Sequence, residues 1–193
     1  MAVYTRINKS DLSLIEKSFK TGKILSFSGI KKGIENTNYL IRTKNKKIIL
    51  TIFEKRVQKK DLPFFMNLMF GLSRQKIKCP EPIKNKKGRY LFKIKNKTAC
   101  LVSFLEGKDK NQLTSKDCFQ VGKNAALLHL AAKKLRLYRK NSLSVNSWGP
   151  LLKRIDKRIN KLSSNLINIM KKDLFDIKKK WPKSMPNGII HCD

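Results

Sequence analysis

The last three residues of the sequence, His191, Cys192 and Asp193, are where residue types and spacing point most directly to chemistry. They follow a turn signal, Pro186-Asn187-Gly188, and an apolar pair, Ile189-Ile190, which together predict a short buried strand that ends in a carboxylate. In α/β folds, functional groups commonly lie at the ends of buried strands. Taken alone, however, Asp193 is better explained as an ordinary last residue, so the rest of the chain has to decide.

A second candidate is the connection from Gly29 to Asn38, which holds glycines at 29 and 33 and the triplet Asn36-Thr37-Asn38. Glycines and small polar residues between two strands can direct backbone N–H groups at phosphate oxygens. The stretch is not a Walker A loop, because no Gly-Lys-Ser/Thr follows, and it lacks the GxGxxG of dinucleotide-binding folds. Taken alone, the spacing of the two glycines is a weak signal, and an ordinary glycine-containing β connection is the better explanation.

The elements that would position these residues change in character along the chain. Alternating and short apolar runs predict strands at 24–28, 39–42, 48–53, 90–94 and 98–105, the first three as an antiparallel meander. The last strand is apolar nearly throughout and should be central or buried on both faces. Helical spacing predicts helices at 10–20, starting near Ser10, and at 61–75.

After Glu106-Gly107 the pattern becomes helical. The stretch Thr114 to Asp117 resembles a capping box that opens a helix to Leu135, with His129 beside its apolar stripe. A loop is expected from 137 to 150, and then a long amphipathic stretch from 151 to 177, as one helix or two. The sequence therefore predicts an α+β protein with a β-rich lobe, residues 1–105, and a helical lobe, residues 106–193.

Composition limits the partners. The net charge is +32, which favours a polyanion-binding surface. Yet the lysines are spread along the chain among Asn and Ile, without an Arg-rich block, so a general codon bias explains them better than a nucleic-acid site.

The four cysteines, Cys79, Cys100, Cys118 and Cys192, show no zinc-binding spacing and are expected to be reduced. Neither a signal peptide nor a membrane span is evident. We therefore expect a cytoplasmic protein.

In combination, several stretches make the chain resemble the homoserine kinase branch of the aminoglycoside-phosphotransferase-like, or choline-kinase-like, superfamily. They extend in colinear order over essentially the whole sequence: Met1–Thr5, Gly29–Tyr39, Leu50–Arg56, Leu62–Phe65, Cys79–Pro82, Val102–Gly107, Leu127–Ala131, Trp181-Pro182 and Pro186–Asp193. Within them, Glu35-Asn36-Thr37-Asn38-Tyr39 is the most specific piece.

The resemblance implies a bilobal protein-kinase-like fold and transfer of the ATP γ-phosphoryl group to the side-chain hydroxyl of L-homoserine, with Mg²⁺, in threonine biosynthesis. It implies that Asp193 is the catalytic carboxylate, with His191 supporting its loop. It also implies a nucleotide site formed by Gly29, Gly33, Asn36, Thr37 and Asn38 over the triphosphate and by Ser103, Phe104 and Leu105 along the adenine.

Two departures from the family pattern stand out. Thr51 occupies the third-strand position where such kinases carry a phosphate-binding lysine. Either a neighbour such as Lys55 or Arg56 supplies the charge, or the phosphates rely on loop amides and metal. The family's metal-binding Asn and Asp would lie beyond residue 193, so we expect a truncated chain that is inactive alone, whose helices expose apolar faces.

Three alternatives stay open. One is a related kinase of amino alcohols or aminoglycosides, and another is a basic nucleic-acid-binding protein. The third is an interaction fragment without catalytic activity. Oligomeric state and the homoserine-contacting residues are not readable from the sequence.

Overall fold

A computed structural model describes residues 3–55, 57–159, 163 and 165–191. The chain forms two compact units, one of residues up to Tyr138 together with those from Gly188 onward, and one of residues Arg139–Asn187. The first contains the helices and strands α1 (Lys9–Ser18), β1 (Ile24–Gly29), β2 (Thr37–Thr43), β3 (Lys47–Ile52), η1 (Lys59–Asp61), α2 (Leu62–Arg74), β4 (Leu91–Ile94), β5 (Lys97–Ser103) and α3 (Ser115–Lys134). The second contains α4 (Val145–Ile159) and α5 (Leu166–Lys180).

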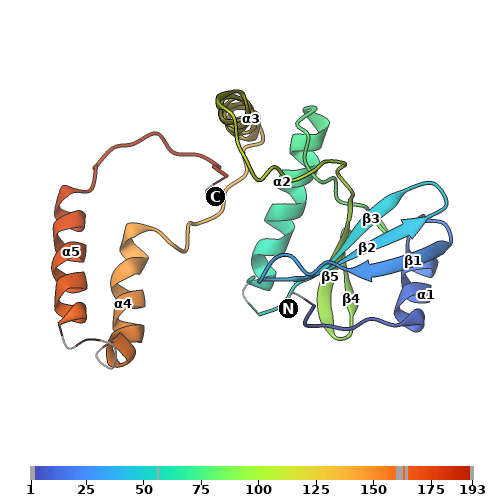
Figure 1. Cartoon of the computed structure of the whole chain (residues 1–193), viewed down its shortest axis with the longest axis horizontal. Coiled ribbons are helices and arrows are strands. Elements are labelled where there is room, and N and C mark those ends of the chain that lie inside the picture. The colour runs from blue at the N-terminus through green and yellow to red at the C-terminus, as the bar shows by residue number, and fades with distance from the viewer. Residues whose placement is uncertain (1–2, 56, 160–162, 164, 192–193) are drawn as a thin grey trace. The chain divides into compact units, whose positions relative to one another are not determined.

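A five-stranded antiparallel sheet organises the first unit, in the order β1-β2-β3-β5-β4 (Figure 1). The predicted meander of the first three strands and the central place of the apolar strand β5 are confirmed. The α+β class with an antiparallel sheet is confirmed as well. The predicted lobe boundary after residue 105 stays a prediction.

Alternation along the strands divides the sheet into two faces. One face packs on α1, whose Leu12 and Ile15 join Ile41, Leu50 and Leu101 in the main core. The other face packs on α2, where Met66 meets Cys100 and Val102. In Figure 1 the strands lie between these two helices.

Two helix starts follow from capping chemistry. Asn8, not the predicted Ser10, caps α1: its Oδ1 accepts from the Asp11 backbone N–H at 3.1 Å, and Asp11 Oδ2 accepts from the Asn8 N–H at 2.9 Å. At α3 the predicted capping box of Thr114 and Asp117 is present. Each reciprocal pair satisfies two backbone donors that the first helical turn leaves free.

The second unit consists of two helices, as one of the two predicted alternatives had it. Leu152, Ile159 and Ile167 form its small core, and the Trp148 and Trp181 rings meet edge to face with centroids 5.3 Å apart. The predicted loop, residues 137–150, extends too far, because α4 already begins at Val145 and contains Pro150. Trp148 Nε1 donates to the Leu143 carbonyl at 2.8 Å and so holds this earlier start.

The strand predicted before His191 is not formed, since residues 186–191 have no regular secondary structure. Ile189 instead packs against the cluster that joins α2 and α3, which contains Leu72, Ala131 and Ala132. The predicted apolar packing of Ile189 is therefore present, but its backbone pairs with no strand of the sheet.

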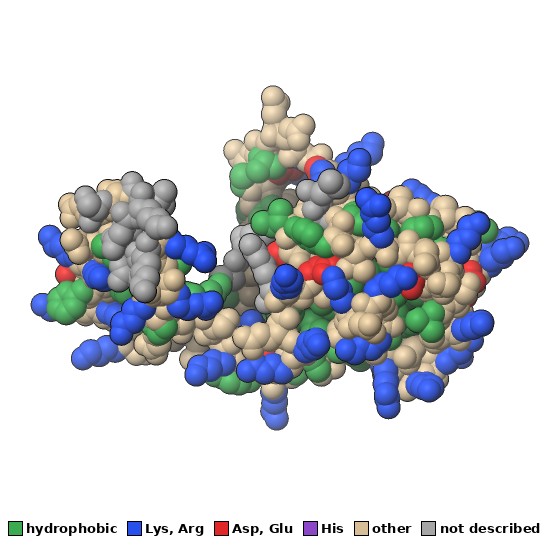
Figure 2. Space-filling view, turned by 90° about the horizontal axis from the view of Figure 1, so that it is seen from below, with side chains coloured by type: hydrophobic (Ala, Val, Ile, Leu, Met, Phe, Trp, Pro, Cys, Tyr) green, Lys and Arg blue, Asp and Glu red, His purple; other side chains and the backbone are tan. Residues whose placement is uncertain are grey.

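Lysine and arginine side chains are spread over the face of the molecule seen in Figure 2, with acidic side chains scattered among them. Within the described ranges, no helix is both long and apolar enough to cross a membrane.

Candidate functional site

The connection between β1 and β2 is shorter than predicted, because β2 already begins at Thr37. The Ile30 N–H donates to the Asn38 carbonyl at 2.9 Å and closes the connection. Gly33 has a φ of +95°, a left-handed conformation that other residues rarely adopt. Gly29 is needed for a different reason: a Cβ there would lie 2.8 Å from Cγ2 of Val3.

Thr37 is a structural centre of this region and is fully buried. Its Oγ1 accepts hydrogen bonds from the backbone N–H groups of Tyr4 and Thr5, at 3.0 and 3.1 Å, and donates to Glu54 Oε1 at 2.8 Å. Because the hydroxyl is fully engaged, Thr37 can offer only its backbone to a ligand in this conformation.

Glu54 joins the same cluster from the segment after β3. Its carboxylate forms an ion pair with Lys97 and accepts from the Thr5 hydroxyl at 2.6 Å. Burial by itself would raise the pKa of Glu54, but the hydrogen bonds from Lys97, Thr5 and Thr37 outweigh it, so the pKa is lowered. The carboxylate is therefore ionised in the folded protein at neutral pH.

The N-terminal segment holds the glycine-containing connection at several points. The Tyr4 hydroxyl donates to the Ile34 carbonyl at 2.9 Å, near the middle of the connection. Val3 lies against Gly29 at one end, and Thr5 reaches Thr37 at the other. The connection is thus positioned by residues 3–5 as well as by the two strands.

Asn38 and Thr51 lie opposite each other on β2 and β3, on the sheet face that also packs on α2. Thr51 Oγ1 donates to Asn38 Oδ1 at 2.8 Å, and both residues are half-buried. Among the described residues, Asn38 Nδ2 makes no hydrogen bond, so its two donors are available to a ligand. A polar pair therefore stands at the position where the resemblance led us to expect a phosphate-binding lysine.

The next row on this face is apolar. Leu40 of β2 pairs with Ile49 of β3, and both are half-buried. Beside β3, β5 ends at Ser103, after which Phe104 and Leu105 continue without regular secondary structure. The Lys47 ammonium lies 5.2 Å from the Phe104 ring centroid and packs this segment against β3.

Ser103 is itself anchored. Its N–H donates to the Glu81 carbonyl at 2.8 Å and its Oγ accepts from the Glu81 N–H at 2.9 Å. The site thus has an apolar row with a fixed backbone segment at one end and polar donors with a glycine-containing connection at the other. That arrangement suits a flat apolar group attached to a negatively charged one.

Charge near the connection comes from Lys32, which forms an exposed ion pair with Asp109. Lys55, one of the predicted substitutes for the missing lysine, is exposed just beyond β3. Arg56, the other, lies outside the described residues, as does Asp193.

The structure thus brings the predicted loop residues Gly29, Gly33, Asn36, Thr37 and Asn38 together, with Asn36 Oδ1 accepting from the Glu54 N–H at 3.3 Å. Sequence reasoning missed the supporting residues Tyr4, Thr5, Glu54 and Lys97. Nothing in the pattern marked Lys97, which is one of 45 basic residues.

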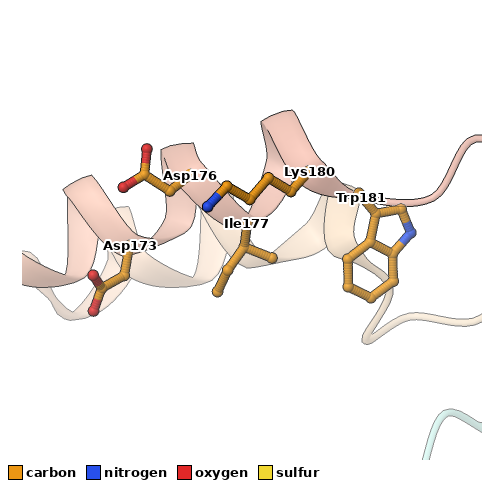
Figure 3. Close-up of a pocket in the computed structure, with 5 residues that line it drawn as sticks. All are labelled: Asp173, Asp176, Ile177, Lys180 and Trp181. Carbon is orange, nitrogen blue, oxygen red and sulfur yellow. The ribbon is translucent and has the colours of Figure 1, made fainter.

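A separate shallow groove lies in the second unit, of about 400 Å³, along the end of α5. Figure 3 shows Lys180 extending back along the helix towards Asp176, with Ile177 between Asp173 and Trp181. The groove lies in the other unit, so it is not part of the site described above.

The fold of this chain occurs in two solved structures of spectinomycin phosphotransferase, APH(9)-Ia. The complex with ADP and spectinomycin has a TM-score of 0.62 at 15% identity, over 95% of this chain and 60% of that chain. The AMP-bound complex has a TM-score of 0.57 at 16% identity, over 94% and 61% of the two chains. The fold is therefore that of an aminoglycoside-phosphotransferase-type, protein-kinase-like protein, as predicted.

Residues 26–193 match the APH family, the phosphotransferase enzyme family, and the chain belongs to it. Over all 193 residues it is 39% identical to a homoserine kinase of Rhizobium etli, 40% to one of Allorhizobium ampelinum and 37% to one of Parvibaculum lavamentivorans. The chain spans 60% of the length of each of these relatives.

Proposed function

We propose that this chain belongs to a homoserine kinase, which transfers the γ-phosphoryl group of ATP to the side-chain hydroxyl of L-homoserine. The observation that carries the proposal is the 37–40% identity to homoserine kinases along the whole chain. Our proposed division has residues 1–105 binding the nucleotide and residues 106–193 beginning the helical lobe that carries the catalytic carboxylate.

In this proposal ATP lies on the α2 side of β2 and β3. The adenine packs on Leu40 and Ile49 and exchanges hydrogen bonds with the backbone groups of Ser103 to Leu105 other than the Ser103 N–H, which is bound to Glu81. The phosphates lie beneath the connection that contains Gly29 and Gly33. Support comes from the half-buried apolar row, which continues into a polar row at the glycine-containing end.

Asn38 takes over part of the role of the missing lysine. Because its Oδ1 is held by Thr51, its Nδ2 group can donate to phosphate oxygens. Asn36 and Thr37 contribute through the backbone of the connection. Lys32 supplies positive charge once the phosphates draw it from Asp109.

Asp193 is proposed to accept the proton of the homoserine hydroxyl as its oxygen attacks the γ-phosphorus. A new oxygen–phosphorus bond forms, the bond from the γ-phosphorus to the bridging oxygen breaks, and ADP leaves with that electron pair. Positioning and charge neutralisation supply most of the rate in such transfers.

Mg²⁺ is implied by this class of reaction, where it neutralises phosphate charge. Within the ranges that the structure describes, no three His, Cys, Asp or Glu side chains group as a metal site would require. The described residues therefore do not by themselves assemble a metal site, and no step above passes through the ion. Mg²⁺ stays a prediction, and we expect the 193 residues alone to have little activity.

The experiment compares two proteins. One is the 193-residue chain, and the other is the same chain extended with the part of the Rhizobium etli relative that it does not span. We expect the extended protein to form O-phospho-L-homoserine, detected by mass spectrometry, while an Asp193→Asn variant does not. A preference for choline or spectinomycin as acceptor, or ordinary turnover by the 193 residues alone, would contradict the proposal.

We further propose that the protein acts in the cytoplasm, in threonine biosynthesis. The free thiols of Cys79, Cys100 and Cys118 agree with a reducing compartment.

The alternative of a nucleic-acid-binding protein rests on the charge of +32 and predicts tight, steeply salt-dependent binding to DNA or RNA. Binding to DNA or RNA that vanishes at physiological salt would rule out this alternative.

A further inference from the structure

His129 connects a titratable side chain to the backbone that leads to Asp193. It lies on α3 and is half-buried. Its Nε2 accepts a hydrogen bond from the backbone N–H of His191, at 3.2 Å. These two residues are 62 positions apart in the chain, so the bond ties two distant segments together.

The segment that donates this bond is held by apolar contact and not by secondary structure. Residues 186–191 have no regular secondary structure, and Ile190 is exposed at 59%. Ile189 is held by apolar contact with the cluster around Ala131 and Ala132 of α3. Apolar packing is not directional, so it fixes where Ile189 lies without fixing how the following backbone is oriented. A hydrogen bond supplies that direction.

α3 is a suitable support because it belongs to the first unit and packs on α2 there. Leu72 of α2 packs on Ala131 and Ala132, and Gln75 Nε2 donates to the Ala131 carbonyl at 3.0 Å. The chain of contacts therefore runs from α2, which covers the sheet, through α3 to His191.

We propose that His129 is a positioning residue, which orients the backbone two residues before Asp193 by accepting the His191 N–H. This inference rests on the proposed function, because it assigns Asp193 the catalytic role. His129 itself takes no part in proton transfer.

The chemistry sets a condition on the imidazole. An imidazole nitrogen accepts only when it carries a lone pair, so Nε2 must be unprotonated and the proton of the neutral ring must be on Nδ1. A neutral histidine in water can carry its proton on either ring nitrogen. The proposal therefore predicts one tautomer for His129.

The composition of the chain makes this testable, since it has just two histidines. We would label the 193-residue chain with ¹⁵N-histidine and record ring and amide spectra at about pH 8, where an unperturbed imidazole is neutral. We expect the Nδ1–H tautomer for His129, and a His191 amide that exchanges slowly with solvent. An Nε2–H tautomer for His129 would overturn the proposal.

Two variants add a second readout. In His129→Leu we expect the His191 amide to exchange roughly five- to tenfold faster, the effect of losing about 1 kcal/mol of hydrogen bonding. In His129→Gln, whose side-chain oxygen can accept, exchange should return towards the original rate. Equal exchange rates of the His191 amide in the original protein and in His129→Leu would contradict the proposed hydrogen bond to His129.

Neither readout uses ATP or homoserine. An Nδ1–H tautomer in the 193-residue chain, together with absent homoserine phosphorylation by the extended protein, would therefore overturn the proposed function and leave the hydrogen bond between His191 and His129 in place. If His129→Leu fails to fold, the tautomer of the original protein still decides.

Discussion

Thr51 Oγ1 donates a hydrogen bond to Asn38 Oδ1 across two paired strands, at 2.8 Å. The bond fixes the orientation of the Asn38 amide, so that Nδ2 is the group offered to a ligand on the α2 side of the sheet. A threonine in place of a lysine thus still takes part in the proposed nucleotide site, through its neighbour.

Replacing Thr51 tests this relationship. Thr51→Val keeps the shape and removes the hydroxyl, so Asn38 can rotate and its donors are no longer held in place. Losing one such hydrogen bond, worth about 1 kcal/mol, should weaken ATP binding roughly fivefold in calorimetric titration. Thr51→Ser, which keeps the hydroxyl, is the matched control. Equal affinities for the two variants would show that the bond has no role in binding.

Thr37→Val should destabilise the first unit by about 2–3 kcal/mol, because it leaves the buried N–H of Thr5 without its acceptor and removes one of the donors to the Glu54 carboxylate. Thr37→Ser should cost about 1 kcal/mol, the value of one methyl group. The measurement is urea unfolding followed by circular dichroism.

The second unit provides an internal control for Thr37→Val. Both tryptophans, Trp148 and Trp181, lie in Arg139–Asn187, so their fluorescence reports that unit. A fluorescence transition that shifts as far as the circular-dichroism transition would contradict a local effect.

Glu54 should make stability depend on pH. Its folded pKa lies below the unfolded value of about 4.3, because the hydrogen bonds from Lys97, Thr5 and Thr37 outweigh burial. A lowered pKa contributes stability above the unfolded pKa, and that contribution is lost as the pH falls through the folded pKa.

The Glu54 prediction is checked with Glu54→Gln. We expect the variant to be less stable than the original protein at pH 7 and the difference to shrink below about pH 4. A difference that stays constant between these two pH values would mean that the ionised carboxylate contributes nothing.

Tyr4→Phe removes the hydrogen bond to the Ile34 carbonyl and little else. Since the bond is exposed, global stability should change by less than about 1 kcal/mol, whereas amide exchange across residues 31–36 should accelerate. Tyr138→Phe is the control, because Tyr138 is 85% exposed. Unchanged exchange in Tyr4→Phe would rule out the hydroxyl as a support of the connection.

The sequence predicted well the parts of this fold that depend on local patterns and predicted poorly the parts that depend on contacts between distant segments. The three-strand meander and the capping box at Thr114 follow from alternation and side-chain chemistry that act over a few residues. The strand expected before His191 followed from local apolar character, but its backbone partner is His129, 62 positions away. Similarly, Lys97 and Glu54 meet only because the strands bring them together.

The central claim is that ATP binds the sheet face that packs on α2, beside the glycine-containing connection. The direct measurement is an NMR titration of the 193-residue chain with ATP. We predict the largest shifts at Gly33, Asn38, Leu40 and Ile49, and little change at Ile15 and Ile41 on the α1 side. Shifts concentrated on the α1 side or in Arg139–Asn187, or none at millimolar ATP, would contradict the claim.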